Sequence, residues 1–371
     1  MPKPLTLITA CDRNYLPGLH VTLLSALTAA VSAKKVDIYL LCEDVTDADL
    51  SPLRYRLDHL ARKRGQVAEL QRVPVSLADF EALPGLRGGN KLTYARLLAP
   101  ALIDAPDALW LDADMVIFQD LAVLQGALAG CRHLVAACQD TGVRLIKNDT
   151  PVPELQSSRD DYFNAGFLWM NLAKMRSTQF TEKMGAFLER YGADLLFHDQ
   201  SALNSFCHDD RIILPGHFNH LLAPWYRDNR HPISLIGKAN LHYLGGDKPW
   251  SKNQRLSCYT RNLIFYHLAH HLGEPNSSYH LARITAAFNQ TSMAKGLQGL
   301  VYQKTTRNQE GTEDRFQSFA EFWGTHRGRY QQEIKTGIAR WVAQVGLTPL
   351  PGLEPTRVRS GSLDLTLQHS H

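Results

Sequence analysis

The chain has few cysteines for its length, and they follow no framework spacing. Six occur among 371 residues, and none forms a C-x-x-C pair. Scattered cysteines of this kind are typical of reduced, mostly buried thiols in a cytosolic protein rather than of a disulfide scaffold. A chain of this length can also bury a large α/β core without covalent staples. We therefore exclude the small disulfide-stapled folds.

Long apolar runs are also missing. No window approaches eighteen uninterrupted apolar residues, so no membrane-spanning helix is expected. The N-terminal Met1-Pro2-Lys3-Pro4 leads into a short strand-like run that meets charge at Asp12, which does not fit a signal peptide. We therefore expect a protein that is made in the cytoplasm and stays there.

The chain lacks a strong excess of either charge. It carries 40 basic and 36 acidic side chains, and the net charge of +4 is too weak to argue for a nucleic-acid partner. Hydrophobic residues make up 44% and charged residues 20% of the chain, so disorder is not the default. These totals fit one large globular domain with an appendage.

Strand-like and helix-like segments alternate in the first part of the chain. Strands are expected at 5–10, 36–42 and 66–73, and helices between them from Pro17 and over 47–64. The first helix has an apolar stripe of one buried face, formed by Leu19, Leu23, Leu24, Leu27 and Val31. This order predicts a parallel sheet with right-handed crossovers, which binds ligands at the carboxyl ends of its strands. Asp12 and Asn14 stand at such an end.

Two carboxylates separated by one small residue interrupt the apolar stretch 108–118. Asp112 and Asp114 follow the strand-like run 108–111, and apolar character resumes at 115–118. If both reach one point, they make a hard-oxygen site for a divalent cation, which can then hold a diphosphate. The alternative is a polar strand end that caps the next turn, and the apolar flanks leave the two interpretations about even.

A later strand end provides a third candidate metal ligand, His242, and a basic residue for the phosphates, Lys248. Carboxylate oxygens and a neutral imidazole are acceptable manganese ligands, so Asp112, Asp114 and His242 would leave positions open for diphosphate oxygens. Lys248 would neutralise the remaining phosphate charge, and Gly245 and Gly246 would let the backbone approach the phosphates closely. Taken alone, His242 in an apolar strand is more often a satisfied core histidine.

The middle of the chain continues the α/β pattern. Helices are expected at 93–103, 121–128, from 172 and from 197, and strands at 133–138, 162–171 and 211–214. The strand at 162–171 is entered through a tight Asn164-Ala165-Gly166 corner. Two loops have composition that suggests a role: 74–91 is expected to close over a ligand, and 141–161 to recognise an acceptor.

The C-terminal part is helical and more basic from about residue 254. His267, His270 and His271 lie within one helical turn, but without Glu or Cys nearby a solvated helix face is favoured over a metal site. The last helices carry residues suited to a membrane-surface patch: Arg327, Arg329, Tyr330, Arg340 and Trp341. The favoured alternative is an amphipathic helix packed on the main domain. Residues 349–371 are expected to form a loose tail.

Several motifs, in order, resemble those of glycosyltransferase family 8, which contains lipopolysaccharide galactosyl- and glucosyltransferases and glycogenin. They lie between about Leu5 and Trp250 and comprise 9–15, 94–97, 111–114, 163–166, 198–200 and 242–250. The last motif, His-Tyr-Leu-Gly-Gly-Asp-Lys-Pro-Trp, is the most specific. The resemblance implies an α/β fold of GT-A type, with a Rossmann-like mixed sheet flanked by helices and a helical C-terminal extension. The implied boundaries are 1–252 for the catalytic domain and 253–348 for the extension.

The resemblance also implies an activity: transfer of a hexose, glucose or galactose, from a UDP-sugar to a glycan, glycolipid or lipopolysaccharide-type acceptor, with retention of configuration and with Mn²⁺ or Mg²⁺. The implied metal ligands are Asp112, Asp114 and His242. The implied nucleotide and diphosphate contacts are Ala10, Asp12, Asn14, Tyr15, Asp112, Ala113, Gly245 and Lys248. Arg96, Asn164, Asp199 and Gln200 would surround the sugar, with Asp140 near sugar and acceptor. No covalent nucleophile is identified.

Two other functions remain open. The stretch 109–116 also fits the strand-D-x-D pattern of haloacid-dehalogenase-like phosphatases, in which Asp112 would be a nucleophile, but that pattern belongs on a first strand. A noncatalytic sugar-nucleotide binder is the other alternative. The intact set of Asp112, Asp114, His242 and Lys248 argues against it.

Overall fold

The computed structural model describes residues 3–81, 83, 91–141, 162–222, 231–246, 248–251, 259–273 and 312–346. Most of the two expected loops, at 84–90 and 142–161, and the expected tail at 349–371 lie outside the described residues. Of the cysteines, five lie in the described part and are free, four of them buried and Cys131 half-buried.

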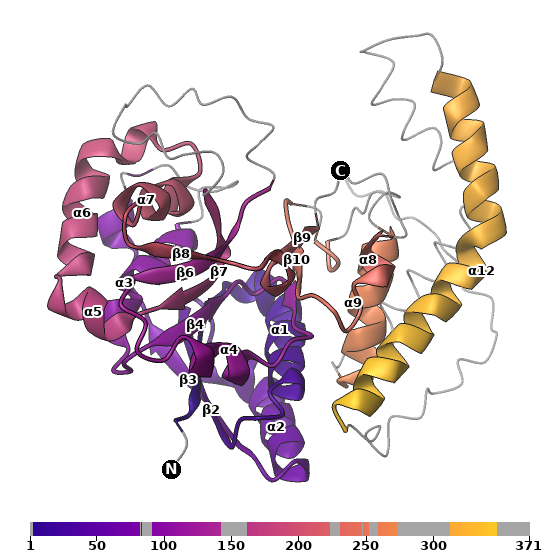
Figure 1. Cartoon of the computed structure of the whole chain (residues 1–371), viewed down its shortest axis with the longest axis horizontal. Coiled ribbons are helices and arrows are strands. Elements are labelled where there is room, and N and C mark those ends of the chain that lie inside the picture. The colour runs from indigo at the N-terminus through magenta and orange to yellow at the C-terminus, as the bar shows by residue number, and fades with distance from the viewer. Residues whose placement is uncertain are drawn as a thin grey trace.

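A seven-stranded mixed sheet forms the centre of the molecule (Figure 1). Its strands are β1 (Leu5–Ala10), β2 (Lys35–Cys42), β3 (Val67–Pro74), β4 (Ala108–Leu111), β6 (Val135–Gln139), β7 (Phe163–Met170) and β8 (Arg211–Leu214). They lie in the order β3-β2-β1-β4-β7-β6-β8, and β7 runs antiparallel to both of its neighbours while the other pairs are parallel. The predicted mixed α/β sheet is confirmed.

A second, three-stranded sheet lies beside the first. It consists of β5 (Met115–Val116), β9 (His220–Leu222) and β10 (Leu241–Tyr243), in the order β5-β10-β9. The chain passes from the large sheet to the small one between β4 and β5, through Asp112, Ala113 and Asp114. The sequence did not predict β9, because three residues carry too little periodicity to mark a strand.

Helices cover both faces of the large sheet. They are α1 (Leu16–Ala29), α2 (Asp47–Lys63), α3 (Ala95–Leu102), α4 (Leu121–Ala127), α5 (Leu172–Ser177), α6 (Phe180–Tyr191), α7 (His198–Phe206), α8 (His231–Ser234), α9 (Tyr259–His271) and α12 (Thr312–Gln344). Short 3-10 helices are η1 (Arg13–Tyr15), η2 (Ala78–Phe80), η3 (Leu92–Tyr94), η6 (Gly192–Asp194) and η7 (Gly216–Phe218). Because neighbouring strand residues point to opposite faces, Leu7 joins the core under α1 and α2, and Ile8 joins the core under α3, α5 and α6.

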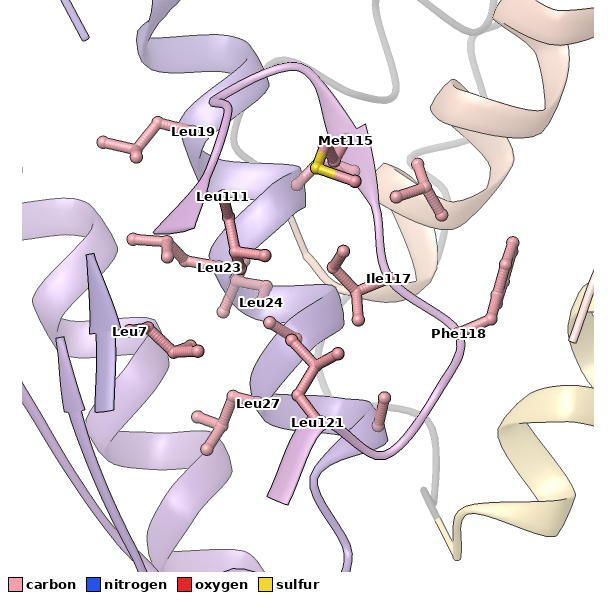
Figure 2. Packing of buried hydrophobic residues seen from close by; sticks show 14 of the residues in the cluster. Leu7, Leu19, Leu23, Leu24, Leu27, Leu111, Met115, Ile117, Phe118 and Leu121 are labelled. Atoms are coloured by element: carbon pink, nitrogen blue, oxygen red, sulfur yellow. The ribbon is translucent and has the colours of Figure 1, made fainter. Parts of the chain in front are cut away.

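Helix α1 is buried on nearly every side, not only along the predicted stripe. All its residues from Gly18 to Ala29 are buried, because it contacts α2, β5 and α9 as well as the sheet. Figure 2 shows Leu23, Leu24 and Leu27 of α1 packed among Leu7, Leu111 and Ile117. The placement of Val31 on the buried stripe was wrong: it lies beyond the end of the helix and is 52% exposed.

The C-terminal helices share the core of the main sheet. Side chains of α9 and α12 belong to the same buried cluster as β1, β2 and α1, and Figure 1 shows α12 lying along α8 and α9. Trp341 packs edge-on against Phe118, with ring centroids 4.9 Å apart, and its indole Nε1–H donates to the Phe118 carbonyl. Tyr330 is buried too. The placement of these two aromatics in a membrane-surface patch was therefore wrong, and the favoured packing on the main domain holds for them.

Two histidines are buried in the helical layers. His267 of α9 is 8% exposed, so the expected solvated face is wrong for this residue, because α12 packs over it. Burial, with nearby positive charge, lowers the pKa of His267 to about 4, and the same holds for His20 of α1. Both imidazoles are therefore neutral at physiological pH.

This burial predicts acid lability. The unfolded chain binds a proton at each histidine near pH 6.5, whereas the folded chain does so only near pH 4. Protonation between these values therefore favours unfolding, and stability falls as the pH drops through this window. We expect urea unfolding at pH 5 to give a free energy lower than at pH 7 by about 2 kcal/mol for each histidine. In His20→Gln the drop should shrink by about that amount; an unchanged drop would contradict the assignment.

Among the described residues, no helix combines the length and the apolar character that a bilayer crossing requires.

Candidate active site

Two carboxylates and an imidazole meet where the two sheets join. Asp112 and Asp114 lie in the turn between β4 and β5, and His242 lies in the middle of β10. One ligand atom from each of the three lies within 4.8 Å of the others, and this is the one such group found in the described part of the chain. The structure thus brings together three residues that are 130 positions apart at most.

The turn that carries the carboxylates is held by backbone hydrogen bonds from both sheets. The Asp112 N–H donates to the Gly166 carbonyl of β7 at 2.8 Å, and the Tyr243 N–H of β10 donates to the Asp114 carbonyl at 3.0 Å. Two hydroxyls of α1 bond the β5 segment from the other side: Thr22 with Met115 and Ser25 with Ile117. The aspartates are therefore fixed by the scaffold and do not lie on a free loop.

Gly166 leaves the space that the His242 ring occupies. A Cβ at this position would overlap His242 Cε1 and lie 2.8 Å from Asp112 Oδ2. The expected corner before the strand lies inside β7 itself, where the register with β6 shifts between Ala137 and Gln139. The sequence showed that this segment is made of small residues. It did not show that the His242 ring leaves no room for a side chain at position 166.

Arg96 links the metal-ligand candidates to a second buried acid. Its guanidinium lies 3.0 Å from Asp112 Oδ1 and 2.9 Å from Asp199 Oδ2, and it also donates to the Ala165 carbonyl. Burial alone would lower the pKa of Arg96, but the two carboxylates outweigh it and raise that pKa. In this structure Arg96 therefore orients Asp112 and Asp199.

Asp199 opens α7 together with Gln200. Burial raises the pKa of the Asp199 carboxyl, although the Arg96 charge and a hydrogen bond from Thr93 oppose the shift. The preceding His198 adopts a φ of 51°, in the left-handed region that non-glycine residues rarely occupy. Such conformations cluster where the fold must aim a side chain at a functional position.

Asp140, Asn164 and Gln200 form a cluster of hydrogen-bonded polar side chains. Asp140 Oδ2 accepts from Asn164 Nδ2 at 3.2 Å and from Gln200 Nε2 at 3.1 Å. Gln200 Oε1 in turn accepts from the Ala165 N–H and from Asn164. The structure thus brings these three predicted residues together, next to Arg96 and Asp199 along β7.

The predicted nucleotide-side residues lie near the start of α1. Asp12 caps η1 by accepting the Tyr15 N–H, and Tyr15 packs edge-on against Trp250, with ring centroids 5.4 Å apart. Burial raises the pKa of Tyr15, as do the nearby charges of Asp114 and Asp12.

The remaining predicted nucleotide contacts differ in how far they are buried. Asn14 is exposed and Ala10 half-buried at the end of β1. Ala113 is buried, and its carbonyl lies so close to Gly18 that a Cβ there would overlap it. Gly245 has a φ of +79°, which favours glycine in the turn after β10.

Lys248 is buried against Asp114. Its ammonium forms an ion pair with Asp114 Oδ2 and donates to the Tyr243 carbonyl at 2.6 Å. Burial would raise the pKa of Asp114, but the adjacent Lys248 charge and the contact with His242 together outweigh it and hold that pKa well below its usual range. Lys248 also lies over the Tyr15 ring, 5.7 Å from its centroid. The predicted phosphate partner thus sits directly beside the acidic pair.

The donor set fits a divalent cation. Two carboxylates and one imidazole suit Mn²⁺, and three protein ligands leave coordination positions open. Asp114 Oδ1 is buried and accepts no hydrogen bond from any described residue, although His242 Nε2 lies 3.2 Å away. A buried carboxylate oxygen without a donor is costly, and a cation between these atoms would remove that cost.

Sequence reasoning missed four residues that shape this site. Asn219 contacts His242, Thr93 and Trp110 donate to Asp199 and Asp112, and Gly18 lies against Ala113 and Trp250. Thr93 and Trp110 carried a usable signal, since each stands one residue before a motif, 94–97 and 111–114. Asn219 lies between two short elements that the sequence did not mark.

The mixed α/β sheet, with the Asp112–Asp114 turn at the end of β4 and His242 on the adjoining small sheet, has the architecture of a GT-A fold. The family described as glycosyl transferase family 8 matches residues 6–254. The chain therefore belongs to glycosyltransferase family 8.

The chain is also similar to curated proteins and to a solved structure. General stress protein A of Bacillus subtilis is 26% identical over 267 residues, covering 67% of this chain and 88% of that protein. Lipopolysaccharide 1,2-glucosyltransferase of Escherichia coli is 26% identical over 254 residues, covering 65% and 71%. The structure of the galactosyltransferase LgtC with donor and acceptor sugar analogs shares the fold, with a TM-score of 0.58 and 23% identity over 71% of this chain and 95% of that one.

Proposed function

We propose that the chain is a retaining hexosyltransferase that moves glucose or galactose from a UDP-sugar to a glycan or lipopolysaccharide-type acceptor, with Mn²⁺ or Mg²⁺ bound by Asp112, Asp114 and His242. The convergence of these three ligands within 4.8 Å carries the proposal. The name of the Escherichia coli relative, a lipopolysaccharide 1,2-glucosyltransferase, supports the donor and acceptor class.

The chemical demand of the reaction is charge stabilisation. When the glycosidic bond of the donor breaks, negative charge grows on the leaving diphosphate, and a divalent cation held by Asp112, Asp114 and His242 would help to stabilise that charge. Lys248 is proposed to add a second positive charge at the same place. Tyr15 and Trp250 form an aromatic wall beside Lys248, and Asp12, Asn14, Ala10, Ala113 and Gly245 are proposed to complete the nucleotide site.

The buried polar residues along β7 are proposed to hold the sugar. Arg96 pairs with Asp199, and Asn164 with Gln200 and Asp140. The two sets meet at the backbone of Ala165, which accepts from Arg96 and donates to Gln200. Asp140 is proposed to lie near sugar and acceptor. Gln200 is held by three hydrogen bonds, so the direction of its amide is fixed. We propose that this amide lies next to the reacting carbon of the donor. We assign no covalent nucleophile.

The test is a donor panel. The purified chain is incubated with UDP-glucose, UDP-galactose and other UDP-sugars in the presence of Mn²⁺, and UDP release is measured. We expect one hexose donor to be turned over well above the others. Release of phosphate from simple monoesters instead would favour the phosphatase alternative. Donor binding without turnover of any donor would favour the noncatalytic alternative.

We further propose that residues 253–348 support acceptor or membrane-surface contact, at the inner face of the membrane. Arg329, Arg340 and Lys238 line a cavity of about 450 Å³ between α8 and α12, and basic residues at a surface attract anionic headgroups.

The expected result is a loss of vesicle binding on charge reversal. Arg329→Glu with Arg340→Glu should weaken binding to phosphatidylglycerol vesicles about tenfold or more. The control is Arg62→Glu with Lys63→Glu in α2, two exposed residues whose reversal changes the net charge by the same amount and should have little effect. Equal losses from both variants would show that only net charge matters.

A further inference from the structure

The two ring nitrogens of His242 have different surroundings. Nε2 faces the acidic pair, 3.2 Å from Asp114 Oδ1 and 3.7 Å from Asp112 Oδ2. Nδ1 points away from the pair and lies 3.1 Å from the side-chain oxygen of Asn219, the residue just before β9. Both His242 and Asn219 are almost completely buried. The role of each nitrogen therefore depends on which end of the Asn219 amide faces the ring.

The Asn219 amide can be oriented from its other partner. Its Nδ2 lies 2.9 Å from Asn164 Oδ1. Asn164 Oδ1 also accepts the Gly166 N–H at 3.0 Å, and a backbone N–H can only donate. Asn164 Nδ2 donates to the Asp140 carboxylate, which can only accept when ionised. The oxygen of Asn164 is therefore fixed toward Asn219, and Asn219 must present its NH₂ group to Asn164 and its oxygen to His242.

Gln200 reinforces the same orientation. Its Oε1 accepts the Ala165 N–H at 3.0 Å, and its Nε2 donates to Asp140 at 3.1 Å. Two backbone N–H groups and one carboxylate thus set the direction of every amide between Asp140 and His242. A flip of Asn164 or Gln200 would turn an NH₂ group toward a backbone N–H, and a flip of Asn219 would turn its oxygen toward the oxygen of Asn164.

We propose that Asn219 is a positioning residue of the metal centre: its oxygen holds Nδ1 of His242 as the donor, which leaves Nε2 as the atom that binds the cation. The proposal rests on the proposed metal-dependent function. Asn219 also completes a chain of side-chain hydrogen bonds that runs from Asp140 through Asn164 to the metal-ligand candidate His242. Asp140 is the residue proposed to lie near sugar and acceptor. Outer partners of this kind orient metal-bound histidines and raise their basicity.

The test measures Mn²⁺ binding rather than turnover. Mn²⁺ is titrated into the metal-free chain in the presence of UDP, at fixed pH, and free Mn²⁺ is read by electron paramagnetic resonance. Asn219→Leu removes the acceptor and should weaken Mn²⁺ binding about 10- to 100-fold. Asn219→Asp keeps an oxygen toward Nδ1–H but turns a second oxygen toward Asn164 Oδ1. It should lower the unfolding temperature while Mn²⁺ affinity stays within about threefold of wild type.

A matched control separates positioning from stability. Asn171 caps α5, far along β7 from the site, with hydrogen bonds to Lys174 N–H and the Cys131 carbonyl. Asn171→Leu should lower the unfolding temperature without changing Mn²⁺ affinity. If Asn219→Leu does not fold, Asn219→Ala takes its place with the same expected loss.

The outcomes distinguish the two proposals. Wild-type affinity in Asn219→Leu or Asn219→Ala, or equal losses in the Leu and Asp variants, would overturn the role of Asn219 and leave the metal centre standing. Failure of the wild-type chain to bind Mn²⁺ would overturn the metal-dependent function, and this inference with it.

Discussion

Replacing Gly166 with alanine is expected to abolish cation binding and to lower kcat/KM for the UDP-sugar by about a hundredfold or more. The added Cβ would overlap Cε1 of His242 and crowd Asp112 Oδ2. Because β4, β7 and β10 are all paired in sheets, the backbone cannot move away without breaking ladder hydrogen bonds. The ring of His242 must therefore leave its position. Mn²⁺ titration and UDP release measure the two effects.

The control for this substitution is a glycine with open space around it. A Cβ on Gly185 in α6 would meet nothing within 4 Å, so Gly185→Ala should keep full activity and gain about 0.5 to 1 kcal/mol of stability from helix propensity. Near-normal Mn²⁺ affinity in Gly166→Ala would show that His242 is not held by the packing described above.

The Asp114–Lys248 pair should behave as a buried unit. Asp114→Asn leaves the Lys248 charge buried without its carboxylate, and Lys248→Met does the reverse. Each should cost about 3–5 kcal/mol of unfolding free energy. The double variant removes both charges and should recover most of that stability, yet it should not bind Mn²⁺, because Asp114 is a ligand. Chemical unfolding combined with Mn²⁺ titration separates stability from function.

An exposed pair provides the comparison. Asp58 and Arg62 form an i,i+4 pair on the surface of α2, and Asp58→Asn should change the unfolding free energy by no more than about 0.5 kcal/mol. If the Asp114→Asn, Lys248→Met double variant were no more stable than either single variant, Asp114 and Lys248 would not be the coupled pair that their geometry indicates.

The acidic pair of the site was readable from sequence because Asp112 and Asp114 follow the end of an apolar strand. The apolar run before Asp112 marked β4. The approach of His242 to the carboxylates rested on the family resemblance, because β10 belongs to a second sheet that the sequence did not predict. Family resemblance supplied their order. The sequence did not reveal that Lys248 pairs with Asp114, because burial and distance depend on the turn after β10.

Other features depend on packing between segments that are far apart. Asn219 follows a 3-10 helix and precedes a three-residue strand, neither of which has a periodic signal. The burial of Tyr330, Trp341 and His267 results from α12 lying on α8 and α9. Amphipathic spacing alone cannot tell a face that meets protein from one that meets water or lipid.

The central claim is that Asp112, Asp114 and His242 form the metal centre of a glycosyltransferase. The most direct measurement is UDP release from the preferred UDP-hexose by wild type and by Asp112→Asn, each with Mn²⁺ and with excess EDTA. We expect wild-type turnover that needs the metal and is restored by adding it back. We expect a loss of about a hundredfold or more in Asp112→Asn. Full turnover in EDTA, or wild-type turnover in Asp112→Asn, would contradict the claim.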